Sequence, residues 1–256
     1  DFVATVSHEL RTPLAAIYGA ALTLRRDDVE LEAELKPKLL EVITEESNRL
    51  AEIVSDLLLA SQLDTGKLFT NVEVCDPRAI AQLELDAART HLPGIVALTL
   101  DAPAALPAVV ADPGQLRQVL SNLIENAVKY SPDGGTVKVA LAPERRHVRF
   151  SVSDSGLGIP PSEQRRIFEK FFRLDPDMTR GIGGTGLGLY ICRELVLQVD
   201  GRIWVESDGR SGSTFHVETP QEALPTPVDG GRRKPAAGYR PSAPAPPPFR
   251  RTPSHA

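Results

Sequence analysis

Hydrophobic residues recur at spacings of three and four in two successive runs within the first 65 residues. The first run is Val3, Val6, Leu10, Pro13, Ile17, Ala21 and Leu24, and the second includes Leu35, Leu39, Val42 or Ile43, Leu50, Ile53 and Leu57. Such spacing places the apolar side chains of each run on one face of an α-helix. Because the polar pair Asp27 and Asp28 separates the runs, we expect two helices joined by a short polar loop.

A hairpin of two helices cannot enclose its own apolar faces. Pairing with a second copy of the chain, as a four-helix bundle, buries them. The periodicity therefore predicts a helical hairpin that forms a homodimer.

From about Thr70 onward, short strand-like segments alternate with helix-like ones. Segments that are rich in β-branched and aromatic residues, or that alternate apolar and polar residues, predict strands at 71–76, 95–101, 137–142, 147–153, 203–207 and 213–218. Periodicity and helix-start signals predict helices at 77–89, from 113 onward, from about 163, and from a glycine-rich loop at 181–188 to about 199. Strands and helices do not alternate as regular βαβ units, so we expect an α+β two-layer sandwich.

Composition is average for a soluble globular protein, with 256 residues of which 41% are hydrophobic and 25% charged. No uninterrupted apolar run reaches the roughly 18 residues that a transmembrane helix needs. The two cysteines are too few for a disulfide framework or a four-ligand zinc site, and they fit a reducing compartment.

Proline and positive charge concentrate at the end of the chain. The segment 220–256 holds ten of the 22 prolines and carries a charge of +4. Because the whole chain has a net charge of −5, residues 1–219 carry a charge of −9. An acidic body argues against nucleic-acid binding. We expect 221–256 to be a disordered, Pro-rich, basic tail with stretches of polyproline II.

A first candidate site lies in the segment SHELRTPL, residues 7–14. His8 and Thr12 are four residues apart and share a helix face that lies off the apolar face. A neutral imidazole can act as a nucleophile, and the adjacent Glu9 could orient the ring and accept its proton. A histidine considered alone is more often an ordinary surface residue.

A second candidate is NLIENAVKYS, residues 122–131, on the helix that begins near residue 113. Asn122, Asn126, Lys129 and Tyr130 form one stripe beside the apolar face. Amide oxygens can bind Mg²⁺, an ammonium group can meet phosphate oxygens, and a phenol ring can cover a base. The alternative is a helix with polar positions that face solvent.

A third candidate is DSGLGIP, residues 154–160, directly after a predicted strand. The Asp154 carboxylate can accept a hydrogen bond from an adenine amino group. Gly156 and Gly158 allow the backbone to approach a ligand closely. Alone, the segment could be an ordinary glycine-rich turn or a fragment of a metal-binding loop.

The fourth is GIGGTGLGL, residues 181–189. Gly181, Gly183 and Gly186 match the dinucleotide-binding spacing, but no strand precedes them, and the P-loop pattern is absent. A flexible loop that runs into a helix N-terminus still offers free N–H groups to phosphate. The candidate contacts are Gly184, Thr185, Gly186, Leu187 and Gly188.

Together with IFEKFFR at 167–173, these segments resemble the phosphoacceptor, N, G1, F and G2 boxes of two-component sensor histidine kinases, in the same order. The resemblance covers about residues 1–220. It implies a HisKA-type dimerisation and histidine-phosphotransfer hairpin at 1–66. It further implies a Bergerat-type ATP-binding domain (HATPase_c) at 70–220.

The resemblance implies autophosphorylation of His8 by ATP, with Glu9 as base or orienting group, and transfer to an Asp of a response regulator. Asn126, with Asn122, would hold Mg²⁺. Lys129 and Arg173 would neutralise phosphate charge, while Asp154 and the glycine boxes bind the nucleotide. In the family a Thr at the place of Thr12 positions a water for regulator dephosphorylation, which makes a bifunctional kinase and phosphatase a further hypothesis.

The chain departs from the family pattern at its start, because only seven residues precede His8. Family hairpins carry further helical turns there, after a sensor or membrane segment. We therefore expect a piece of a longer protein that dimerises more weakly than a chain extended upstream. It would be the cytoplasmic portion of a parent anchored in a bacterial membrane.

Two other classes of protein compete with this interpretation. An ATPase or serine kinase on the same nucleotide fold would resemble only the second half of the chain, and the box around His8 argues against it. A non-catalytic dimeric scaffold would show a broken N or G box, and none is broken.

Overall fold

The computed structural model describes residues 2–26, 34–90, 95–174 and 184–222, with side chains from Val6 onward. The expected polar loop at Asp27 and Asp28, residues 181–183 of the fourth candidate segment, and residues 223–256 of the expected tail fall outside the described residues. The first two residues of that expected tail, Gln221 and Glu222, are instead ordered, since their N–H groups donate to the carbonyls of Arg146 and Ala108.

The N-terminal part is a helical hairpin of α1 (Phe2–Leu24) and α2 (Leu35–Asp64). Pro13 and Ile53, which belong to the predicted apolar faces, are buried. Ala20 and Ala60 are buried as well, although the periodicity did not single them out. Tyr18 and Leu58 remain 65% and 61% exposed in the single chain. The two predicted helices are confirmed.

The C-terminal part contains a five-stranded mixed sheet with the strand order β2-β4-β5-β7-β6. Its strands are β2 (Val96–Asp101), β4 (Gly135–Pro143), β5 (His147–Ser153), β7 (Thr214–Pro220) and β6 (Arg202–Glu206). The pair β2–β4 is parallel and the other pairs are antiparallel. Two short strands, β1 (Glu73–Cys75) and β3 (Val109–Ala111), pair separately.

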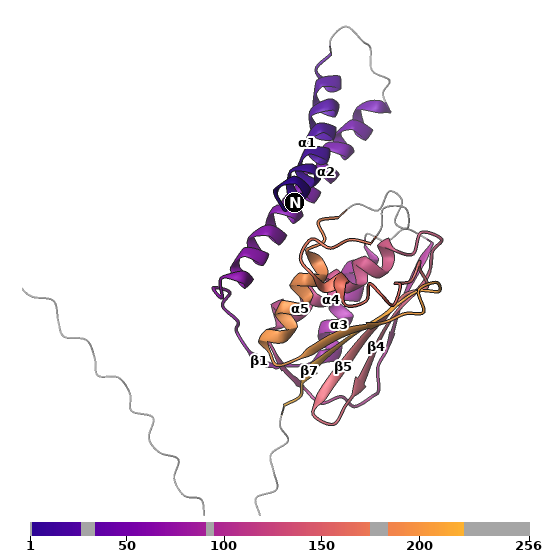
Figure 1. The fold of residues 1–256 in the computed structure, drawn as a ribbon. Coiled ribbons are helices and arrows are strands. Elements are labelled where there is room, and N and C mark those ends of the chain that lie inside the picture. Colours follow the sequence, from indigo (N-terminus) through magenta and orange to yellow (C-terminus); the bar gives the residue numbers. More distant parts are fainter. Residues whose placement is uncertain (1, 27–33, 91–94, 175–183, 223–256) are drawn as a thin grey trace, which may run out of the picture. The chain divides into compact units, whose positions relative to one another are not determined.

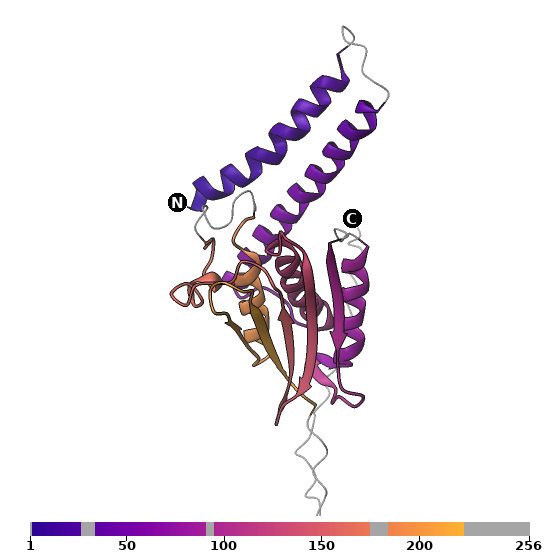
Figure 2. The ribbon, with the colours of Figure 1, turned by 90° about the vertical axis from the view of Figure 1, so that its right-hand side faces the viewer.

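Three helices lie against one face of this sheet, which gives the two layers seen in Figures 1 and 2. They are α3 (Pro77–Arg89), α4 (Pro113–Lys129) and α5 (Gly188–Gln198). Asp76 and Asp112 cap α3 and α4, since each side chain accepts hydrogen bonds from backbone N–H groups of the first turn. The expected two-layer sandwich is confirmed.

Alternation along the strands separates the two faces of the sheet. Val148, Phe150 and Val152 on β5 are fully buried against the helices. Arg149 and Ser151, between them, pair with Glu218 and His216 of β7 on the opposite face. The core therefore lies between the sheet and α3, α4 and α5.

One expectation needs correction, and one strand was missed. The helix predicted from about residue 163 is only a 3₁₀ turn, η1 (Arg166–Phe168). The backbone becomes extended at Glu169 and left-handed at Phe171 (φ 65°), while Phe168 packs edge-on against Phe215. The strand β3 was not predicted, because its three residues carry little pattern and are held by pairing with β1.

Among the helices that the structure describes, none combines the length and hydropathy that crossing a bilayer requires.

Candidate nucleotide and phosphoacceptor site

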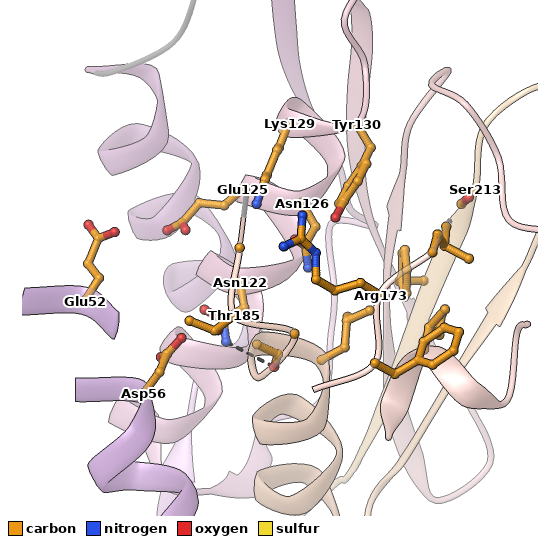
Figure 3. Close-up of a pocket in the computed structure, with 18 of the residues that line it drawn as sticks. Glu52, Asp56, Asn122, Glu125, Asn126, Lys129, Tyr130, Arg173, Thr185 and Ser213 are labelled. Carbon is orange, nitrogen blue, oxygen red and sulfur yellow. Dashed lines mark hydrogen bonds between the residues drawn. The ribbon is translucent and has the colours of Figure 1, made fainter. Parts of the chain in front are cut away.

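A cavity of about 810 Å³ lies over the N-terminal end of α5, beside α4 and the glycine-rich loops. The sequence-predicted residues that line it are Asn122, Asn126, Lys129, Tyr130, Asp154, Gly158, Arg173, Gly184, Thr185, Gly186 and Gly188. Figure 3 shows several of them converging on one space. The fold thus brings together four segments that are far apart in the sequence.

Asp154 is fixed at one end of the cavity by two backbone donors. The N–H groups of Gly156 and Ser213 donate to its Oδ1 at 2.9 and 3.2 Å. Desolvation by burial raises the pKa of this carboxyl, while the two backbone hydrogen bonds lower it. A fixed acceptor in a partly apolar pocket suits the amino group of a purine.

Close approach of the backbone around Asp154 depends on glycine. A Cβ at Gly156 would lie 2.0 Å from the carbonyl oxygen of Tyr130. Gly156 therefore shapes the wall of the cavity, although its own atoms do not line it.

The stripe predicted on α4 faces the cavity. The Asn122 side chain donates to the carbonyl of Gly188 at 3.3 Å and accepts from Gln118 at 3.0 Å, so it joins α4 to the start of α5. Desolvation lowers the pKa of Lys129, and the charges of Arg173 and Arg49 lower it further. The carboxylates Glu9 and Glu125 raise this pKa in part. Because the net shift disfavours the charged form, a bound anion such as a phosphate would stabilise the ammonium group.

Asn126 supplies the cavity with an amide oxygen, the kind of hard oxygen ligand that Mg²⁺ accepts alongside phosphate and water oxygens. The donor set therefore fits Mg²⁺. Asn122 also lines the cavity, but both ends of its amide already have protein partners. Asn126 is the better placed of the two.

The glycine-rich loop enters α5 through a left-handed turn that glycine adopts without strain. Gly186 has φ 69°, and its carbonyl accepts a hydrogen bond from Phe171 N–H at 3.0 Å. Thr185 Oγ1 accepts from Leu187 N–H at 3.2 Å. The Leu187 side chain is fully buried in the core, so only its backbone could serve a ligand.

The phosphoacceptor candidate is on the surface of α1. The His8 side chain is 78% exposed, and its Nδ1 lies 4.0 Å from Glu9 Oε1. Thr12 Oγ1 donates to the backbone carbonyl of His8 at 3.3 Å. The predicted outward orientation of His8 is confirmed.

Glu9 has partners beyond His8. Its Oε1 accepts from the Arg173 guanidinium at 2.9 Å, and its Oε2 lies 3.8 Å from Arg49 on α2. Since Arg173 also lines the cavity, as Figure 3 shows, one carboxylate contacts both the phosphoacceptor and the nucleotide site. Arg173, predicted as a phosphate ligand, is thus held by Glu9 in this structure.

Sequence reasoning missed several lining residues, among them Ser213, Arg49, Glu52, Asp56 and Glu125. Desolvation raises the pKa of Asp56 to about 6, and the neighbouring carboxylates Glu125 and Glu52 raise it as well. For Arg49, Glu52 and Asp56, the available signal was the polar face of α2. The periodicity of α2 does not reveal that this face lines a cavity.

Both parts of the chain match known families. Residues 1–66 match the His Kinase A (phospho-acceptor) domain, and residues 111–223 match the histidine kinase-, DNA gyrase B-, and HSP90-like ATPase family.

Among proteins of similar sequence, the circadian input-output histidine kinase CikA of Synechococcus elongatus is 38% identical over 232 residues. That match covers 90% of this chain and 31% of CikA. Three of the curated relatives are covered over 31%, 57% and 36% of their own lengths, so the chain corresponds to only part of each.

Two solved structures share the fold. The Acinetobacter baumannii histidine kinase AdeS is 25% identical with a TM-score of 0.65, over 84% of this chain and 98% of that one. Full-length ShkA in complex with AMPPNP is 30% identical with a TM-score of 0.61, over 88% of this chain and 46% of ShkA.

The two domains follow one another in a single chain, with His8 in the first and most of the cavity lining in the second. Relatives that align with most of the chain are histidine kinases. The chain therefore belongs to the sensor histidine kinases of two-component systems, of which it comprises a transmitter core.

Proposed function

We propose that this chain transfers the γ-phosphoryl group of ATP to His8 and then to an Asp of a response regulator receiver domain. The observation that carries the proposal is the position of Glu9. Its carboxylate lies 4.0 Å from the His8 ring and 2.9 Å from Arg173, which lines the nucleotide cavity.

In the chemical step, a ring nitrogen of His8 attacks the γ-phosphorus atom. A phosphorus–nitrogen bond forms, the bond to the β–γ bridging oxygen breaks, and ADP leaves. The imidazole proton passes to Glu9 or to solvent. Such a transfer depends mostly on positioning and charge neutralisation.

Each part of the cavity has a task in this scheme. Asp154 accepts a hydrogen bond from the adenine amino group, and Lys129 and Arg173 neutralise phosphate charge. Asn126 would hold Mg²⁺, whose chemistry is to neutralise phosphate oxygens. The N–H groups at the start of α5 face the phosphates. The AMPPNP complex of ShkA supports a nucleotide in a site of this fold.

Arg173 cannot serve Glu9 and the γ-phosphate fully at the same time. ATP would draw the guanidinium from Glu9, which frees that carboxylate to orient His8. In this way, ATP binding and preparation of the phosphoacceptor become one event.

The partners follow from the hairpin. A second copy covers the exposed apolar side chains of α1 and α2 in a four-helix bundle. The receiver domain docks near the exposed His8 and takes its phosphoryl group. Thr12, one turn further along α1, would position a water molecule for dephosphorylation of the regulator. Unchanged phosphatase activity in Thr12→Ala would contradict this role.

The proposal is tested by incubating the chain with Mg²⁺ and ATP labelled at the γ-phosphate, then adding candidate receiver domains. We expect label on the chain that moves to one receiver, and none from ATP labelled at the α-phosphate. His8→Gln should abolish labelling, while His147→Gln, on β5, should not. Equal labelling of both variants would contradict the proposal.

A further inference from the structure

We propose that Asp64 is a positioning residue that holds the F-box segment, residues 167–173, so that Arg173 reaches the γ-phosphate. The inference deepens the function proposed above and rests on it. It assigns a task to a carboxylate that belongs to none of the sequence boxes.

Asp64 is the last residue of α2, and its carboxylate accepts hydrogen bonds from two different elements. Lys170 Nζ, in the F-box segment, donates to Oδ2, and Tyr190 Oη, in α5, donates to Oδ1. The hydrogen bonds from Lys170 and then Tyr190 lower the pKa of Asp64. Desolvation, followed by the bond to Asp64, raises the pKa of Tyr190 to about 12.

The end of α2 is a firm base for this contact. Ala60, one turn earlier, is 1% exposed within the hydrophobic core that includes α4 and α5. Beyond the helix, Thr70 Oγ1 donates to Gln198 at 2.7 Å, at the end of α5. Asp64 is therefore fixed relative to α5, which begins at the phosphate-binding loop.

The segment that Lys170 belongs to is short and constrained. Phe171 has φ 65°, a left-handed conformation that persists only where the surroundings impose it. Its N–H donates to Gly186, and Arg173, two residues on, pairs with Glu9. Three residues span at most about 10 Å, so fixing Lys170 limits where Arg173 can go.

The F-box segment is thus tied to the hairpin at two points, by Asp64 through Lys170 and by Glu9 through Arg173. When Arg173 turns from Glu9 to the γ-phosphate, the bond to Glu9 is lost. The contact between Lys170 and Asp64 then keeps the segment, and with it Arg173, beside the cavity.

The consequence is specific for nucleotides that carry a γ-phosphate. Lys170→Gln or Asp64→Asn should weaken binding of a non-hydrolysable ATP analogue by roughly threefold to fivefold, the size expected for one exposed, hydrogen-bonded ion pair. ADP affinity should stay within about twofold, because ADP offers Arg173 no γ-phosphate.

Calorimetric titration with the analogue and with ADP, in the presence of Mg²⁺, tests this. Lys170→Arg should restore the ratio of the two affinities, and the double variant should lose no more than either single one. Asp86→Asn is the matched control, since that carboxylate pairs at 2.6 Å with Arg89 on α3, outside the cavity lining.

Three results would overturn the inference: an unchanged affinity ratio in both single variants, an equal loss of ATP analogue and ADP, or additive losses in the double variant. The titrations need no phosphoryl transfer. They therefore judge the role of Asp64 separately from phosphorylation of His8, whose absence would count against the proposed function instead.

Discussion

Asp56 carries a local electrostatic conflict with Glu52 on its own helix and Glu125 on α4. Burial and these two carboxylates raise the pKa of Asp56 to about 6. A carboxyl whose pKa is raised on folding stabilises the fold at low pH. That contribution is lost as the pH rises through 6.

Asp56→Asn should therefore raise the melting temperature at pH 8 by about 2–4 °C, the shift that roughly 1 kcal/mol gives a chain of this size after solvent screening is allowed for. The gain should shrink as the pH falls below 6 and vanish below about 4. Calorimetry across this range measures it. Ser55→Asn, at the exposed neighbouring position, should show no such trend; a constant difference for Asp56→Asn at every pH would contradict the assignment.

At the residue scale, the sequence indicated the groups with distinctive chemistry and missed those placed by tertiary pairing. Asp154, Asn126 and Lys129 line one cavity, as their motifs suggested. Ser213 supplies a backbone donor to Asp154 only because β7 pairs with β5. Nothing local to Ser213 distinguishes it from any other strand-end serine.

At the scale of elements, the contact between the F-box segment and the glycine-rich loop needs a residue without a side chain. A Cβ on Gly186 (φ 69°) would lie 2.8 Å from backbone atoms of Phe171 and Phe172. Gly66 has a similar φ of 62°, but nothing lies within 4 Å of its added Cβ.

Both Gly186→Ala and Gly66→Ala should lose about 1–2 kcal/mol of stability to left-handed strain. Only Gly186→Ala should also weaken ATP binding, by about tenfold or more, because the loop must shift to relieve the clash. Chemical denaturation and calorimetric titration separate the two effects. Normal ATP affinity in Gly186→Ala would show that ATP binding does not require the described conformation of this loop.

The hairpin makes a second prediction at this scale, because Leu58 on α2 is 61% exposed in the single chain. If a second copy covers it, Leu58→Lys should raise the dimer dissociation constant about tenfold or more, the cost of unburying a leucine. Sedimentation velocity measures the change. Leu83→Lys, at a 49% exposed position on α3, should leave the dimer unchanged; equal effects would exclude this face of α2 as the interface.

Elements with local start signals were predictable. Asp76–Pro77 and Asp112–Pro113 each combine a capping carboxylate with a proline that is tolerated at the first helical position, and α3 and α4 begin there. The segment after residue 163 was mispredicted as a helix, because the Phe168 ring packs against Phe215 of β7 and the Phe171 backbone N–H donates to the carbonyl of Gly186. These contacts are between residues far apart in the sequence, and helical periodicity does not predict them.

In the molecule as a whole, we infer that the hairpin and the sandwich serve one reaction. The hairpin contributes an exposed imidazole, a carboxylate and, from α2, part of the cavity lining. The sandwich contributes the rest of the cavity, with an acceptor for adenine and cations for phosphate. Glu9 and Arg173 join them. A scaffold without activity would have no use for this ion pair beside an intact nucleotide cavity.

The chemical stability of the phosphorylated chain tests whether the hairpin and the cavity act together in transfer to His8. After incubation with Mg²⁺ and γ-labelled ATP, the label should survive alkali and be lost in acid, as a phosphorus–nitrogen bond requires. Peptide mapping should place it on His8, and His8→Ala should carry none. A label that is stable in acid, or one that persists in His8→Ala, would contradict phosphoryl transfer to His8.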